Sequence, residues 1–104
     1  MSDSLLVDPL GRTITLHDRT WFGHILKAHP EIAAARTMVE SVIRAPREIR
    51  FSRSGKNSRL YFGSGASESN IMMVVVDISL GLVKTAHRAR KITGGEVEWS
   101  RLNP

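Results

Sequence analysis

Hydrophobic side chains recur with a helical period in the first half of the chain and with a period of two after residue 46. Within residues 18–29, apolar residues fall every three to four positions, which places them on one face of a helix. Residues 31–44 carry a second apolar stripe of the same period, and Ala45-Pro46 ends it. We therefore expect two successive helices, separated at Pro30.

The rest of the sequence predicts β structure on both sides of these helices. Asp8-Pro9-Leu10-Gly11 has the residues of a type I turn, so residues 5–17 predict a small hairpin. Strands are expected in EIRFSRS (48–54), RLYFG (59–63), IMMVVVDI (71–78) and LVKTAHRAR (82–90), with a loop over 63–70 and a short last strand within 91–102.

This order predicts an α+β fold. We expect two N-terminal helices packed on one face of an antiparallel sheet of about four strands, preceded by a small β-hairpin. The second helix and strand 71–78 are expected to meet in the core, with Val75 buried between them.

Composition indicates one small domain, residues 1–104. The chain is 41% hydrophobic, which is enough for a single core, and it has no cysteine for disulfides or thiolate metal sites. Residues 1–12 lack the cationic start and apolar run of a signal peptide, and no stretch reaches the roughly 20 apolar residues of a membrane span. We expect a cytoplasmic protein without membrane contact.

Positive charge is concentrated in two of the predicted β segments. Residues 44–60 hold six of the fifteen Lys and Arg residues and one acid, and residues 84–91 hold four and no acid, in a chain of net charge +5. Cations repeated along neighbouring strands attract polyanions, although any one of them can be an ordinary solvated side chain. The cations that we expect to bind RNA phosphates are Arg53, Lys56, Arg88, Arg90 and Lys91.

The histidines are the side chains best suited to acid–base chemistry. Thr85 and His87 are two residues apart on a predicted strand, so they share one face at a separation of about 7 Å. His29 lies on the apolar face of the first helix and His24 at its margin, where either can be a packing residue instead. His24 has no histidine three or four positions later, and the acids are not clustered, so we expect no metal and no cofactor.

Arg59 and Tyr61 lie on one face of the strand that follows the basic turn. Such a pair can clamp a phosphate and stack a base. The structural alternative is a half-buried strand tyrosine beside a solvated arginine.

Five short motifs occur in an order typical of one group of nucleases. They are D-x-x-G-R-x-[IV]-x-L at 8–16, W-x-x-H-I-x-x-x-H-P-E at 21–31, R-L-Y at 59–61, [VT]-x-T-A-[HY] at 83–87 and K-I-x-x-G-E-x-x-W at 91–99. The chain resembles the small phage- and mobile-element-associated nucleases of the barnase, EndoU, colicin and RelE superfamily. The resemblance implies helices on a four-stranded antiparallel sheet, an active site on the open sheet face, and metal-independent RNA cleavage to a 2′,3′-cyclic phosphate. The catalytic set that it implies is His24 or His29, Arg59 and Tyr61, and Thr85 with His87 or Arg90.

Two functions are therefore expected from the sequence. The first is a small metal-independent endoribonuclease, of the kind found among toxins, with RNA as substrate and an acidic antitoxin or immunity protein as a further partner. The alternative is a noncatalytic nucleic-acid-binding or protein-interaction module, in which the cations bind phosphates and the histidines are packing residues.

Overall fold

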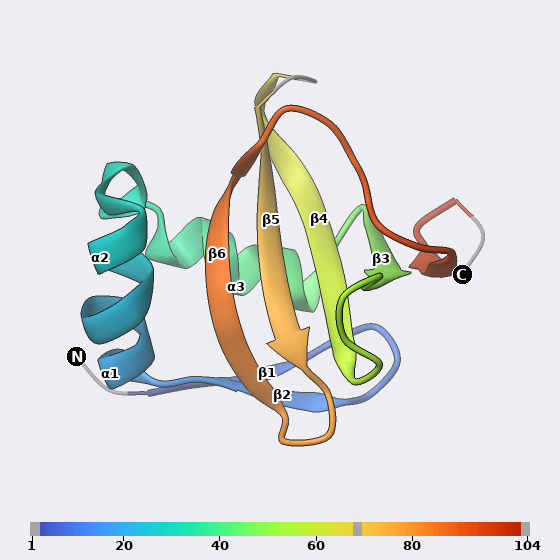
Figure 1. The fold of residues 1–104 in the computed structure, drawn as a ribbon, viewed down its shortest axis with the longest axis horizontal. Coiled ribbons are helices and arrows are strands. Elements are labelled where there is room, and N and C mark those ends of the chain that lie inside the picture. Colours follow the sequence, from blue (N-terminus) through green and yellow to red (C-terminus); the bar gives the residue numbers. More distant parts are fainter. Residues whose placement is uncertain (1–2, 68–69, 103–104) are drawn as a thin grey trace.

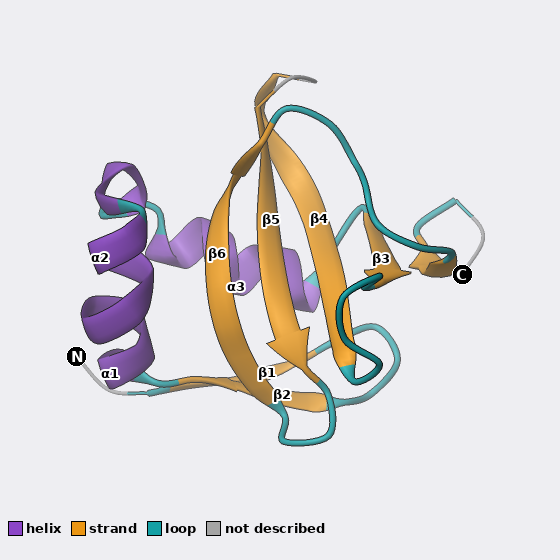
Figure 2. Ribbon diagram, in the orientation of Figure 1, coloured by secondary structure: helices purple, strands orange, loops and turns teal. Residues whose placement is uncertain are grey.

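The structure, a computed structural model, describes residues 3–67 and 70–102 of the chain. These residues form a curled mixed sheet of seven strands in the order β1-β2-β6-β5-β4-β3-β7 (Figures 1 and 2). The strands are β1 (Ser4–Val7), β2 (Thr13–Leu16), β3 (Glu48–Phe51), β4 (Ser58–Ser67), β5 (Asn70–Asp77), β6 (Leu82–Ala89) and β7 (Val97–Ser100). All neighbouring strands are antiparallel except β2 and β6, which are parallel.

A single parallel contact joins the N-terminal hairpin to the central strands. Thr15 pairs with Leu82, and the Thr15 backbone N–H donates to the Gly81 carbonyl oxygen over 2.7 Å. Gly81 has a φ of +65°, and a Cβ there would lie 2.8 Å from the Thr13 carbonyl oxygen. Glycine is therefore needed at this junction for both its backbone conformation and its lack of a side chain.

The first helical region runs beside β6 rather than across the sheet (Figure 1). It consists of α1 (Asp18–Thr20), a π-helical segment η1 (Trp21–Ile25) and α2 (Leu26–Ala28), in direct succession. His29 leaves the helical conformation at φ −136° and ψ 68°, as expected for a residue that precedes proline. A 3₁₀ turn, η2 (Pro30–Ile32), follows.

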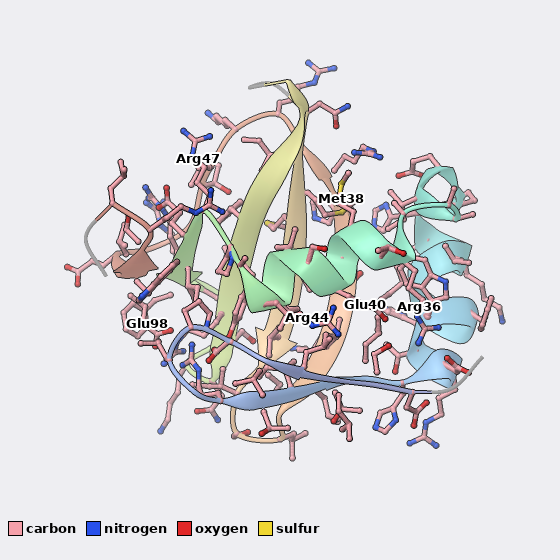
Figure 3. The ribbon with its side chains drawn as sticks, turned by 180° about the vertical axis from the view of Figure 1, so that it is seen from behind. Arg36, Met38, Glu40, Arg44, Arg47 and Glu98 are labelled. Carbon is pink, nitrogen blue, oxygen red and sulfur yellow. The ribbon has the colours of Figure 1, made fainter. Side chains whose placement is uncertain are left out.

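The second helix, α3 (Arg36–Arg44), lies on the concave side of the sheet, between the β1–β2 hairpin and the central strands (Figure 3). Its residues Val39, Val42 and Ile43 are buried in the core. Arg36, which is 7% exposed, connects the two helical regions, since its Nη1 lies 2.7 Å from Asp18 Oδ1. The remaining core side chains include Leu6, Ile14, Leu16, Trp21, Ile25, Ile49, Tyr61, Met72, Val74 and Val76.

The predicted architecture of two helices on a four-stranded antiparallel sheet was wrong. The predicted hairpin is not a separate element, because its pairing with β6 extends the main sheet. The last strand, β7, also joins the sheet, at the edge of β3. The expected helix 31–44 is shortened to a 3₁₀ turn and α3, with non-helical backbone at Ala35. The protein is therefore mostly β, a curled half-barrel with two short helical regions.

Strand alternation also differs from the prediction at two places. On β5, Val74 and Val76 are buried on the core side, whereas Val75 is half-buried on the opposite, open face. On β6, a bulge separates the pairs Val75–Thr85 and Val76–Val83, so Lys84 is an extra residue without a partner on β5. This bulge turns Val83 into the core while Thr85 and His87 face outward. The expected loop over 63–70 is instead strand for much of its length, because β4 continues to Ser67.

Within the part of the chain that the structure describes, no helix is long and apolar enough to cross a membrane.

Candidate functional site

Two of the predicted histidines meet on the open face of the sheet. The ring centroids of His29, which follows α2, and His87, on β6, lie 5.0 Å apart, and the ring planes are inclined at 31°. Both side chains are half-buried, with 32% of the His29 side chain exposed. They are 58 positions apart in the sequence, so only the packing of the first helical region against β6 brings them together.

The contacts of the two rings differ in a way that suits complementary proton-transfer roles. His87 Nδ1 lies 3.0 Å from the Arg88 carbonyl oxygen. A carbonyl oxygen can only accept, so in this contact Nδ1 carries the hydrogen and Nε2 of the neutral ring is left as an acceptor. His29 Nδ1 lies 3.5 Å from Glu31 Oε1, and this carboxylate pairs with the protonated form of the His29 ring.

The surface around His87 is mainly apolar. Thr85, half-buried, faces the same side two residues before His87. His87 is opposite Met73 on β5, and Met73 is opposite Phe62 on β4, so the three side chains form a row on the open face. Phe62 is fully buried although it lies on this face. The segment between β6 and β7 packs against Leu60, two residues before Phe62 on β4: a Cβ at Gly94 would lie 2.7 Å from Leu60 Cδ1.

The other predicted catalytic pair, Arg59 and Tyr61, lies on the core side of β4 in a buried polar network. The Tyr61 hydroxyl donates to Asp8 Oδ2 over 2.5 Å and accepts from Arg12 Nη2 over 3.2 Å. Arg59 Nε donates to Glu98 Oε2 over 2.8 Å, and its guanidinium stacks on the Phe51 ring at 4.3 Å. Figure 3 shows Glu98 near the turn of the β1–β2 hairpin, where these groups gather.

Arg12 holds this network together. Its Nε donates to Asp8 Oδ2 over 2.8 Å, and its Nη2 and Nη1 donate to Glu98 Oε1 and Oε2 over 2.7 and 3.2 Å. Asp8, only 4% exposed, also accepts from the backbone N–H groups of Leu10 and Arg12. Charged groups that are this closely paired fix the hairpin turn against β4 and β7.

The network changes the proton affinities of its members. Burial raises the pKa of the Tyr61 phenol, and its hydrogen bond to Asp8 raises it further. Burial also acts to raise the pKa of Asp8, but hydrogen bonds from Tyr61 and Arg12 outweigh it and hold the pKa below the usual 3.8. In Glu98, the hydrogen bonds from Arg12 and Arg59 likewise outweigh burial, so its pKa lies below 4.5.

The remaining predicted residues are divided among separate places. His24 is exposed on η1, and its ring makes no hydrogen bond or ring contact with any other residue that the structure describes. Arg53 and Lys56 are exposed in the turn between β3 and β4. Arg90 and Lys91 are exposed at the opposite end of the sheet, just after β6, and Arg88 Nη1 lies 3.4 Å from Asn70 Oδ1.

Sequence reasoning gave no site role to Asp8, Arg12, Glu31 or Glu98. Asp8 was visible as a turn residue and, with Arg12, as a letter of the motif at 8–16, whereas Glu98 falls on an unspecified position of the motif at 91–99. A carboxylate two positions after His29 was the one available signal for Glu31. The partners of these residues come from distant segments, so the sequence alone contains no pattern that pairs them.

Two further features lie outside the predicted site. A hollow of about 180 Å³ between α3 and β4 is lined by Met38, Ser41, Val42, Ala45, Gly63 and Arg101. Residues 3–67 and 70–102 contain no group of three or more His, Cys, Asp or Glu side chains arranged to hold a metal ion.

Comparisons with protein-family models, with curated proteins and with solved structures found no match for this chain.

Proposed function

We propose that the protein is a metal-independent endoribonuclease that uses His29 and His87 as its acid and base. The observation that carries this proposal is the 5.0 Å contact between the two half-exposed imidazole rings. Imidazoles exchange protons near neutral pH, and a pair of them supplies both proton transfers that RNA cleavage needs. We also propose that the protein is cytoplasmic, where RNA is available.

In the proposed reaction, His87 Nε2 takes the proton from a ribose 2′-hydroxyl. The 2′-oxygen then attacks the adjacent phosphorus, the bond from phosphorus to the 5′-oxygen breaks, and protonated His29 gives its proton to the leaving 5′-oxygen. The products are a 2′,3′-cyclic phosphate and a free 5′-hydroxyl. Arg90 and Lys91, three and four residues after His87, are exposed cations that can stabilise the charge that develops on the phosphate.

Arg59 and Tyr61 are not part of this mechanism. Their polar atoms are occupied by Asp8, Arg12 and Glu98, and Tyr61 is fully buried. We assign both to stabilising the fold. Thr85 shares the open face with His87, and we place it as a contact to the ribose or phosphate.

The test is cleavage of a labelled RNA by purified protein in EDTA, with DNA and 2′-O-methyl RNA as substrates that cannot react. Cleavage should yield a cyclic phosphate, and His29→Ala and His87→Ala should each lower the rate by about 10²–10⁴-fold. His17→Ala removes an imidazole that contacts Asp3 instead and should keep the wild-type rate. Folded wild-type protein that leaves a broad RNA panel intact contradicts the proposal, and so does a loss of cleavage with His24→Ala but not His29→Ala.

A noncatalytic RNA-binding module is the second candidate. The observation in its favour is that Arg53, Lys56, Arg90 and Lys91 are exposed and make no ion pair with any described residue. An acidic antitoxin or immunity protein would compete with RNA for the same cations. RNA binding without cleavage in the same assay would select this function.

A further inference from the structure

Three apolar side chains lie together on the open face of the sheet, next to His87. Met73 on β5 is directly opposite His87, and Val75, two residues later on the same face, is opposite Thr85. Leu60 on β4 is in turn opposite Val75. Leu60, Met73 and Val75 are all half-buried, so part of each residue can still be contacted. We call these three side chains the apolar floor.

The open face is covered at one end and accessible at the other. Ile71 and Phe62 share this face with the apolar floor, and both are buried although neither belongs to the core cluster on the other side of the sheet. Along β5, burial on this face decreases from Ile71, which is buried, to Met73 and Val75, which are half-buried. The accessible part adjoins the histidine pair. Adjacent apolar side chains with polar groups at their rim are typical of a binding surface.

The proposed reaction determines which part of an RNA meets the apolar floor. His87 takes its proton from a ribose 2′-hydroxyl, and the base of that nucleotide is attached to the neighbouring carbon of the same ribose. The base therefore has to lie over a side chain that adjoins His87. Side chains directly opposite one another on neighbouring strands are about 5 Å apart, so Met73 is one such position.

The other positions around His87 are less suited to a base. The His29 ring occupies one side, with its centroid 5.0 Å from that of His87. Just beyond the end of β6 lie Arg90 and Lys91, whose charges suit the phosphates on either side of the ribose. Thr85, two residues before His87, carries a hydroxyl that suits the ribose or phosphate instead. This leaves β5, where the apolar floor begins.

The contacts that the apolar floor offers do not depend on which base is bound. Its side chains have no hydrogen-bonding group other than the thioether of Met73, which is a weak acceptor and packs well against aromatic rings. On β3, Glu48 and Arg50 bind one another, with Arg50 Nε 2.7 Å from Glu48 Oε2, so this pair is not free to read the edge of a base. A base held by its ring face alone can be any of the four. It must be unpaired, because a duplex keeps its bases stacked on their neighbours.

We propose that the apolar floor binds the base of the nucleotide whose 2′-hydroxyl His87 deprotonates, so that the substrate class is single-stranded RNA with little base preference. This inference rests on the proposed function for the position of the ribose, and it adds the surface that holds the nucleotide there. A duplex cannot present a base to the apolar floor while its ribose lies at His87. Met73, directly opposite His87, is the first side chain that the base contacts.

An abasic substrate tests where the base lies. The substrate is a single-stranded 2′-O-methyl oligonucleotide with one ribonucleotide, so cleavage can occur at one position only. Removing the base from that ribonucleotide should lower kcat/KM by roughly tenfold, as expected for the loss of one stacking contact. Removing a base several nucleotides away is the matched control and should have little effect. Exchanging the base at the ribonucleotide should change kcat/KM less than its removal does, and pairing the oligonucleotide with its complement should stop cleavage.

Met73→Ala tests the same contact from the side of the protein. It should lower kcat/KM on the intact oligonucleotide by a similar factor and have little further effect on the abasic one, because the contact is already lost there. Met38→Ala is the matched control, since it removes a half-buried methionine from α3, on the other side of the sheet, and should keep the wild-type rate (Figure 3). Circular dichroism melts establish that each variant is folded.

Binding separates this proposal from the nuclease proposal. The same oligonucleotide with 2′-deoxyribose at the cleavage position cannot react, and fluorescence anisotropy measures its affinity. If Met73→Ala and base removal each weaken this binding but no RNA is cleaved, the nuclease proposal is wrong and the apolar floor remains a base-binding surface. If wild-type protein cleaves the abasic and intact oligonucleotides equally well, or cleaves the duplex as fast as the single strand, the apolar floor does not bind the base and this proposal is overturned.

Discussion

Tyr61 belongs to the buried polar network beside the turn of the β1–β2 hairpin. The phenol is fully buried, donates to Asp8 and accepts from Arg12, which is an arrangement for holding the fold. Tyr61→Phe leaves an Asp8 oxygen without one donor, and we expect it to lower the free energy of unfolding by about 1–3 kcal/mol. Urea melts measure this loss. Cleavage by the folded variant should stay close to the wild-type rate, and a loss as large as that of His87→Ala would return Tyr61 to the catalytic set.

The network also predicts how stability depends on pH. The pKa values of Asp8 and Glu98 lie below 3.8 and 4.5 in the folded protein, because hydrogen bonds from Tyr61, Arg12 and Arg59 outweigh burial. A lowered folded pKa contributes stability that is present above the unfolded pKa and is lost as pH falls through the folded value.

We therefore expect the free energy of unfolding to be level near neutral pH and to fall steeply below about pH 4.5, the higher of the two usual values. Urea melts from pH 7 to pH 2 measure the curve. Glu98→Gln removes one titrating carboxylate and should flatten the acid limb while lowering stability at pH 7. An acid limb that is unchanged in Glu98→Gln would show that Glu98 does not titrate with folding.

At this scale the sequence identifies candidate residues but not their groupings. Residue type and strand position are enough to select His87, and helix position is enough to select His29. The contact between them depends on how the first helical region packs beside β6, and no local pattern reports that. The same limit explains why Arg59 and Tyr61, adjacent in the sequence to the basic turn, were expected at the active site and lie instead with Asp8 and Glu98.

Among the elements, α3 and β4 make an unusually close approach at Gly63. A Cβ built at Gly63 would lie 2.2 Å from Val42 Cγ2, so a side chain there would require α3 or the Val42 side chain to shift. We expect Gly63→Ala to lower the free energy of unfolding by about 1–3 kcal/mol. In the double variant Val42→Ala/Gly63→Ala the nearest Val42 atom left is Cβ at 3.2 Å, which needs a far smaller shift. The two effects should therefore be markedly less than additive in thermal or urea melts. Additive effects would show that the two side chains do not compete for the same space.

The two faces of β5 give a second prediction at this scale. Val74 is fully buried in the core, whereas Val75 is half-buried on the open face. Val74→Asp buries an unpaired charge and should prevent folding, with a cost of several kcal/mol. Val75→Asp makes the same chemical change one residue away and should leave a cooperative thermal transition by circular dichroism. A folded Val74→Asp variant would mean that the face of β5 is assigned incorrectly.

The elements themselves were largely predictable, and their assembly was not. Period-two patterns located β3, β5 and β6, and the Asp-Pro-Leu-Gly turn located the hairpin of β1 and β2. The parallel contact of Thr15 with Leu82 is set by tertiary packing, so no local sequence pattern indicates that the hairpin extends the sheet. The bulge at Lys84 was not predicted either. Val83 and Thr85 are two residues apart, which in a regular strand places both on one face, but the bulge makes them face opposite sides of the sheet.

At the scale of the whole molecule, two pairs of exposed cations lie at opposite ends of the sheet. Arg53 and Lys56 precede Ser58, which is opposite Asp77 at one end, whereas Arg90 and Lys91 follow Ala89, which is opposite Ile71 at the other. His87 belongs to the second end. His87 is level with Phe62, because both are opposite Met73, and the four residue steps along β4 from Ser58 to Phe62 span roughly 13 Å. We therefore expect that a dinucleotide bound at His87 does not reach the Arg53 turn.

We therefore expect Arg90 and Lys91 to contact both short and long RNAs, and Arg53 and Lys56 to contact long RNAs only. Arg90→Glu/Lys91→Glu should weaken binding and cleavage of both a dinucleotide and a long RNA. Arg53→Glu/Lys56→Glu makes the same charge change and should weaken binding of the long RNA only.

For the long RNA, each lost phosphate contact should lower the slope of log affinity against log salt by about 0.7. Titrations at several salt concentrations measure the slope, and single-turnover cleavage measures the rate. If the two double variants weaken binding of the dinucleotide equally, the two ends of the sheet do not form separate phosphate-binding surfaces. If affinity does not change with salt, phosphate contacts do not dominate binding, and the assignment of these cations to RNA phosphates is wrong.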